Sequence, residues 1–120
     1  MQVERREFPR INIRCKAHII FGERVLVFDS HTLNLSNAGM RVALEEKLHV
    51  TTPVALELFL ADGAKPLQCK GEVVWVKERA AAEQKAPLFD TGIKFVEISS
   101  ADQEQIKRLV DAWLAHRKAS

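Results

Sequence analysis

The sequence has 120 residues, of which 47% are hydrophobic and 28% are charged, and its formal net charge at pH 7 is +2. This balance is typical of one globular domain and excludes a disordered or fibrous chain. No apolar stretch approaches the ~20 residues that a membrane helix needs, and no apolar run follows the first basic residues. We therefore expect neither membrane insertion nor a signal peptide.

The positive charge is concentrated at the N-terminus. Residues 1–16 carry a net charge of +3, and the rest of the chain sums to −1. Pro9 restricts Phe8 to extended conformations, so residues 1–10 are expected to form a flexible N-terminal arginine arm. A basic arm on a nearly neutral body suggests an anionic partner, whereas a general nucleic-acid binder would spread its basic residues over a whole face.

Alternating hydrophobicity predicts a β-barrel over residues 11–98. The first alternation covers residues 11–21, and Gly22 and Glu23 form a plausible tight turn after it. Further strands are expected over residues 25–35, 40–44, 54–60, 67–77 and 92–96, with a connecting loop over residues 79–87. We expect Val74, Trp75 and Phe95 to lie in the core.

The last segment has the period of a helix. Apolar residues recur there at three- and four-residue spacing: Ile106, Leu109, Val110, Trp113 and Leu114. This pattern predicts an amphipathic C-terminal helix over residues 101–118, with Ser100 and Gln103 as a capping box. The expected fold is mainly β, a six-stranded antiparallel barrel whose open end or flank is covered by the helix.

The residues that usually carry catalysis or bind metals are scattered. Cys15 and Cys69 lie far apart, and the four histidines show no ligand spacing with them. We therefore expect two free, partly buried thiols in a reducing compartment and no metal site. No acid/base pair, no nucleophile with an adjacent base and no glycine-rich phosphate loop is evident. The sequence thus predicts no enzyme and no cofactor.

Two short motifs stand out instead. Arg6 and Arg10 form an R-x-x-x-R pair with Arg5 directly before it, and residues 34–39 read N-x-S-x-x-G, 24 residues after Arg10. A guanidinium can bond bidentately to guanine O6 and N7, pair with phosphate and stack on aromatic planes. These arginines therefore suit a ligand that contains both guanine and phosphate.

The second motif is expected to be a polar patch on the barrel wall. Because side chains alternate along a strand, Asn34 and Ser36 should share an outer face with Thr32, while the leucines between them face the core. The Asn34 amide and the Ser36 hydroxyl supply hydrogen-bond donors and acceptors. Gly39 suits either a turn with positive φ or a place where a ligand meets the backbone.

Together and in this order, the two motifs resemble those of the PilZ domain family, and the resemblance covers essentially the whole chain. It implies a single PilZ-type domain that binds the second messenger cyclic di-GMP in the cytoplasm. The implied ligand-binding residues come from both motifs: Arg5, Arg6, Arg10, Asn34, Ser36 and Gly39. Ligand binding would fold the arm onto the barrel and signal to a downstream protein in motility, pilus or exopolysaccharide control.

Two other functions stay open at this point. One is a degenerate PilZ-like interaction module that binds a protein and no nucleotide. The other is a small barrel that binds RNA or DNA, which would need exposed aromatic residues interleaved with basic ones. The chain has no tyrosine, and its basic excess is confined to the arm. The sequence therefore favours a nucleotide sensor without polymeric nucleic acid as a partner.

Overall fold

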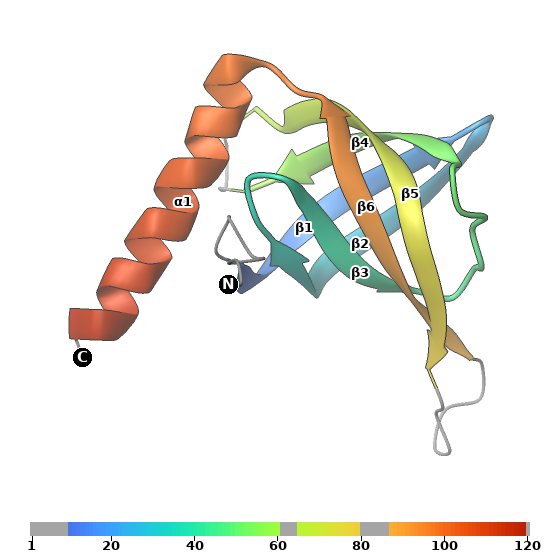
Figure 1. Cartoon of the computed structure of the whole chain (residues 1–120), viewed down its shortest axis with the longest axis horizontal. Helices are drawn as coiled ribbons and strands as arrows, with labels where there is room; N and C mark the ends of the chain where they lie inside the picture. Colours follow the sequence, from blue (N-terminus) through green and yellow to red (C-terminus); the bar gives the residue numbers. More distant parts are fainter. Residues whose placement is uncertain (1–9, 61–64, 80–86, 120) are drawn as a thin grey trace, which may run out of the picture.

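The computed structural model describes residues 10–60, 65–79 and 87–119. Its elements, in chain order, are β1 (Ile11–Phe21), β2 (Arg24–Leu35), β3 (Gly39–Leu44), β4 (Pro53–Phe59), β5 (Leu67–Arg79), β6 (Leu88–Glu97) and α1 (Ser100–Ala119). These six strands form a closed antiparallel barrel in the spatial order β1-β2-β3-β6-β5-β4, with α1 beside it (Figure 1). The expectation of a mainly β fold with a C-terminal helix is confirmed.

The barrel closes because each strand finds two neighbours. β1 pairs with both β2 and β4, whereas β2 meets β3 only through Asn34 with Arg41 and Leu35 with Met40. Gly22 has a φ of 60° and forms the tight turn between β1 and β2, as expected. Most of the expected connecting loop over residues 79–87 lies outside the described residues.

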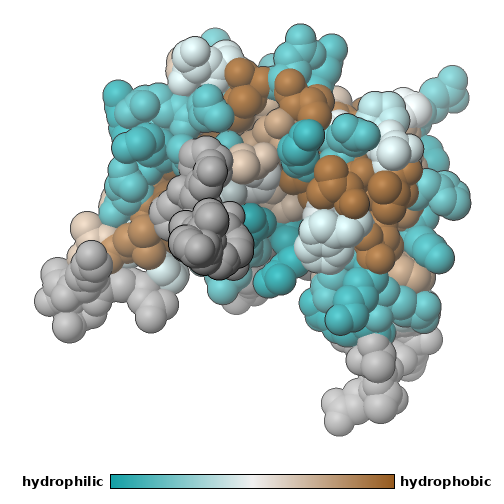
Figure 2. Space-filling model, in the orientation of Figure 1, coloured by the Kyte–Doolittle hydropathy of each residue, from teal (hydrophilic) through white to brown (hydrophobic). Residues whose placement is uncertain are grey.

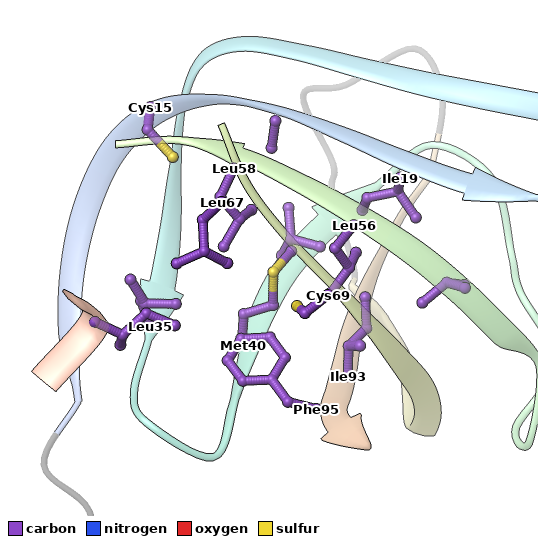
Figure 3. Close-up of a cluster of buried hydrophobic side chains, with 14 of the residues drawn as sticks. Cys15, Ile19, Leu35, Met40, Leu56, Leu58, Leu67, Cys69, Ile93 and Phe95 are labelled. Atoms are coloured by element: carbon purple, nitrogen blue, oxygen red, sulfur yellow. The ribbon is translucent and has the colours of Figure 1, made fainter. Parts of the chain in front are cut away.

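The core fills the barrel interior. Along β1, Ile11, Cys15, Ala17 and Ile19 are all buried, so the alternation expected from the sequence points them inward. Figure 3 shows Cys15, Leu35, Leu58 and Met40 reaching into one interior from different strands. Fully burying one such aliphatic side chain stabilises a fold by about 1.5–3 kcal/mol. The predicted burial of Phe95 is confirmed, since Phe95 is only 9% exposed.

The expectation that Val74 and Trp75 belong to the core is wrong. Val74 is 40% exposed and Trp75 is 41% exposed, because the β5–β6 register shifts between Val73 and Trp75. The irregularity puts both side chains outside. The Trp75 indole lies over Gly92, where an added Cβ would come within 2.2 Å of its Nε1 atom. An exposed aromatic ring thus rests on the one residue type that leaves room for it.

The helix packs by the stripe that the sequence predicts. Ile106 and Val110 are buried, and Leu109, Trp113 and Leu114 pack partly buried against the core. Among the strands, α1 lies nearest β1, and it stands at the end of the barrel where β1 begins (Figure 1). No helix in the described part of the chain is long and apolar enough to cross a membrane.

The helix begins differently from the expectation. Ser99, not Ser100, is the cap, because the Ser99 Oγ atom accepts a hydrogen bond from the Asp102 backbone N–H at 3.0 Å. The Ser99 carbonyl accepts the first helical bond, from the Gln103 N–H, at 2.9 Å. Two consecutive serines make the choice ambiguous in the sequence, and these two bonds identify Ser99 as the cap.

The outer surface is uneven in character. Figure 2 shows hydrophobic residues gathered over β5 and β6 on the face in view, with hydrophilic residues over the far ends of these strands. Val74 on β5 and Val96 on β6 are 40% and 52% exposed. At the hydrophilic end, Arg79 of β5 forms an ion pair with Asp90 of β6, with 2.5 Å between Nη2 and Oδ1.

Candidate functional site

The two sequence motifs meet at the start of the barrel. Ile11 of β1 pairs with Leu35 of β2, which brings the chain before β1 next to the end of β2. There the Arg10 Nε–H donates a hydrogen bond to Asn34 Oδ1. Antiparallel pairing therefore joins residues that are 24 positions apart in the sequence. Of the predicted arm arginines, Arg5 and Arg6 lie outside the described residues.

The Asn34 amide is held from two sides. Its oxygen accepts from Arg10, and its Nδ2 group donates to Asn12 Oδ1 at 3.1 Å. An amide oxygen has two lone pairs and an amide nitrogen has two hydrogens, so one acceptor position and one donor position remain for a ligand. Asn34 is half-buried, and the amide is thus oriented before any ligand arrives.

Ser36 does not join Asn34 on an outer face, contrary to the prediction. β2 ends at Leu35, the chain turns, and Ser36 becomes fully buried. Its hydroxyl accepts from the Ala38 N–H at 3.2 Å and lies 3.4 Å from the Gly39 carbonyl oxygen, while its backbone N–H donates to that same oxygen at 2.9 Å. Ser36 therefore shapes the β2–β3 turn from within.

Gly39 is required by close packing and not by a left-handed φ. Gly22 is the glycine with positive φ among the described residues. An added Cβ at Gly39 would lie 2.2 Å from the Ile93 carbonyl oxygen of β6. Next to this contact, the Phe95 N–H donates to the Ala38 carbonyl at 2.9 Å. The glycine lets β3 lie against β6, and this pairing fixes the position of the whole turn.

A row of paired residues extends from Asn34 across the outer wall. In register, Asn12 pairs with Asn34, Asn34 with Arg41, Arg41 with Gly92, and Gly92 with Trp75. We call these five residues the outer row. Where both residues of such a pair carry a Cβ atom, these atoms lie about 4.5–5.5 Å apart, so the members of the row are close neighbours. The outer row combines two amides, an arginine and an exposed indole.

Of the outer row, sequence reasoning singled out Asn34 alone as a site residue and missed Asn12, Arg41, Gly92 and Trp75. The alternation over residues 40–44 already placed Arg41 outside, but no motif singled it out. Trp75 was assigned to the core, and only the irregular β5–β6 register exposes it. Within the described residues, the Arg41 side chain is exposed and has no hydrogen-bond or ion-pair partner.

Other titratable groups belong to the scaffold. Burial raises the pKa of the Cys15 thiol to about 11 and that of Cys69, which also faces the charge of Asp102, to about 11. Both are free cysteines. On β4, hydrogen bonds from His18 and Gln68 lower the pKa of Glu57. In the residues that the structure describes, no group of three or more His, Cys, Asp or Glu side chains could hold a metal ion.

Comparisons with known proteins agree with this architecture. The PilZ domain model matches residues 4–112. The PilZ domain of YcgR from Escherichia coli, solved with c-di-GMP, superimposes with a TM-score of 0.71 and 20% sequence identity, covering 97% of this chain and 98% of that one. No curated protein sequence matches the chain.

Two longer structures contain the same fold. The Klebsiella pneumoniae MrkH–c-di-GMP complex has a TM-score of 0.73 and 18% identity over 98% of this chain and 57% of that one. The Bacillus subtilis inhibitor of motility, MotI/DgrA, has a TM-score of 0.74 and 15% identity over 95% of this chain and 53% of that one. This chain thus spans little more than half of either. With the family model matching most of its length, the chain belongs to the PilZ domain family.

Proposed function

We propose that this protein is a cytoplasmic receptor for cyclic di-GMP with no catalytic activity of its own. The observation that carries the proposal is the contact between Arg10 and Asn34, which joins the two PilZ motifs in one place. Two similar structures, the YcgR PilZ domain and MrkH, were solved with c-di-GMP. A guanidinium beside an oriented amide offers the donors and acceptors that guanine and phosphate require.

The five motif residues and Arg5, which directly precedes the first motif, have two kinds of role in this proposal. Arg5, Arg6, Arg10 and Asn34 contact the ligand through their side chains. Ser36 and Gly39 act through the backbone, because Ser36 is buried and Gly39 lies against β6. They hold the β2–β3 turn where its exposed edge meets the ligand.

Ligand binding is proposed to close residues 1–10 over the outer row. The arginines of the arm gain partners in the ligand, and the ordering of the arm reduces the affinity but changes the shape of the surface. The altered surface then presents itself to a downstream protein, in motility, pilus or exopolysaccharide control. Hydrogen exchange of the arm with and without cyclic di-GMP tests this step, and unchanged exchange at saturating ligand contradicts it.

Isothermal titration calorimetry of the full chain with cyclic di-GMP tests the receptor function. We expect binding by the wild type and roughly 5- to 150-fold weaker binding by Arg10→Ala, since one arginine anchor contributes about 1–3 kcal/mol. Arg10→Lys keeps the charge but loses the planar fork, so it should recover only part of the affinity. Arg108→Ala, an exposed helix position, is the matched control and should bind like the wild type.

Absence of any binding heat at high protein and ligand concentration, for a folded wild type, would refute the proposal. That result would favour the interaction module that binds no nucleotide. Equal affinity of Arg10→Ala and the wild type would leave a receptor whose site lies elsewhere.

A further inference from the structure

A polar hollow of about 250 Å³ opens on the barrel wall beside Asn34. Residues of five strands line it, and they include Asn12, Asn34, Arg41, Ala43, Arg79 and Asp90. We call it the polar hollow. Ala43 pairs directly with Asp90 and takes up little space, because its side chain is a single methyl group. Asn12 and Asn34 belong to the strands on one side of β3, and the Arg79–Asp90 ion pair belongs to the strands on the other.

The charged side chains of the polar hollow differ in whether they already have a hydrogen-bond or ion-pair partner. Arg41 is exposed and has no hydrogen-bond or ion-pair partner within residues 10–60, 65–79 and 87–119. Arg79 holds Asp90, whose side chain is 26% exposed. A carboxylate has about four lone-pair positions, so Asp90, which lines the hollow, keeps acceptor capacity beyond its bond to Arg79. Arg41, which has no partner among the described residues, and Asp90, which is held by Arg79, thus line the same small space.

This pair of charges matches one nucleobase better than the others. The Watson–Crick edge of guanine presents two neighbouring donors, N1–H and the N2 amino group, and a carboxylate accepts from both. Adenine presents an acceptor at N1 and places its amino group at C6, so it cannot make this pair of bonds. The guanidinium of Arg41 can pair with a phosphate or with guanine O6 and N7.

The size of the polar hollow fits part of a dinucleotide. Sites that enclose a whole small molecule span about 300–1,000 Å³, so a space of about 250 Å³ suits a single base. Asn34 belongs both to the polar hollow and to the contact with Arg10. A ligand held by the motif residues would therefore place one of its bases next to Arg41 and Asp90.

We propose that the polar hollow is a guanine subsite, in which Asp90 accepts the N1–H and N2–H donors of the base and Arg41 binds the adjoining phosphate. This inference rests on the proposed function, because it concerns the same ligand. It adds two binding residues outside the motifs and assigns the choice of base to Asp90. Arg79 is a positioning residue, since it holds the Asp90 carboxylate in place.

Three substitutions test the proposal by calorimetry with cyclic di-GMP and cyclic di-AMP. Asp90→Asn keeps the size of the side chain but replaces one acceptor by a donor, so affinity for cyclic di-GMP should fall at least tenfold and the preference over cyclic di-AMP should shrink. Arg41→Gln should weaken cyclic di-GMP binding at least tenfold. Ala43→Leu fills the hollow without touching a charge and should have a similar effect.

The controls separate this inference from the receptor function. Arg108→Gln removes an exposed positive charge on α1 and should stay within twofold of the wild type. The thermal melting temperature and circular dichroism identify any variant that fails to fold, and Arg41→Gln, at an exposed position, keeps the test open if Asp90→Asn unfolds. If Arg10→Ala loses affinity while Arg41→Gln and Ala43→Leu bind within twofold of the wild type, the subsite is refuted and the receptor stands. A wild type that binds no cyclic di-GMP refutes both.

Discussion

The substitution Gly39→Ala tests whether the motif glycine is needed for the packing of β3 against β6 or for the approach of the ligand. The added Cβ would lie 2.2 Å from the Ile93 carbonyl oxygen and 3.1 Å from the Lys94 Cα atom, both in the backbone of β6. Real Cβ atoms essentially never approach closer than 3.0 Å, so β3 and β6 must separate by roughly 0.8 Å or more at this point. No side-chain rotation can relieve the contact.

The expected loss in the free energy of unfolding follows from these contacts. Overpacking of this kind costs about 1–3 kcal/mol, and loss of the neighbouring hydrogen bond from the Phe95 N–H to the Ala38 carbonyl adds about 1 kcal/mol. The free energy of unfolding should therefore fall by about 2–4 kcal/mol. At about 4–5 °C per kcal/mol for a domain of this size, the melting temperature should drop by about 8–20 °C.

Differential scanning calorimetry without ligand measures this drop, and Gly22→Asn is the matched control. Gly22 has a φ of 60° but nothing within 4 Å of an added Cβ, and asparagine adopts left-handed backbone readily. That variant should lose less than about 1 kcal/mol. A Gly39→Ala protein that melts like the wild type, yet no longer binds cyclic di-GMP, would overturn the packing argument and assign the glycine to direct ligand approach.

The remaining predictions concern the helix cap, the exposed indole and the buried thiols. Ser99→Ala should cost about 1 kcal/mol and speed amide exchange in the first turn of α1, while Ser100→Ala should do neither, which chemical denaturation and hydrogen exchange can check. Cyclic di-GMP should quench or shift tryptophan fluorescence through Trp75 on the outer row, and a signal that survives in Trp75→Phe would contradict this. The thiol pKa values of Cys15 and Cys69 rise from 9.0 to about 11 on folding, so their stabilising effect is complete below about pH 9 and is lost as the pH rises to 11. The double Cys→Ala variant should lack that alkaline decline in a series of melts, and an identical decline would point to other groups.

The strand alternation and the helical stripe were sufficient to predict the barrel and its C-terminal helix. Local periodicity decides which side chains face inward, and burial of Ile11, Ala17 and Ile19 on β1 follows it directly. The sequence predicted that the two motifs would serve one ligand, whereas the direct contact of Arg10 with Asn34 follows from the antiparallel pairing of β1 with β2, which only the structure shows. The barrel, the helix and the motifs could be predicted because each depends on a pattern of residues that lie close together in the sequence.

Features that depend on register could not be predicted in this way. Ser36 is buried because the chain turns one residue earlier than the alternation implied, and Trp75 is exposed because an irregularity in β5 shifts its pairing. The polar hollow needs Asn12, Arg41 and Asp90 to arrive from three strands at one place.

The sequence by itself determined that this protein is a small barrel with an N-terminal arginine arm and a polar second motif. The tertiary structure decided which side chains a ligand can reach. The physical reason is that hydrophobic periodicity acts within each strand, whereas a surface site arises from the alignment of strands with one another. A shift of one residue in that alignment changes which side of the wall a side chain occupies.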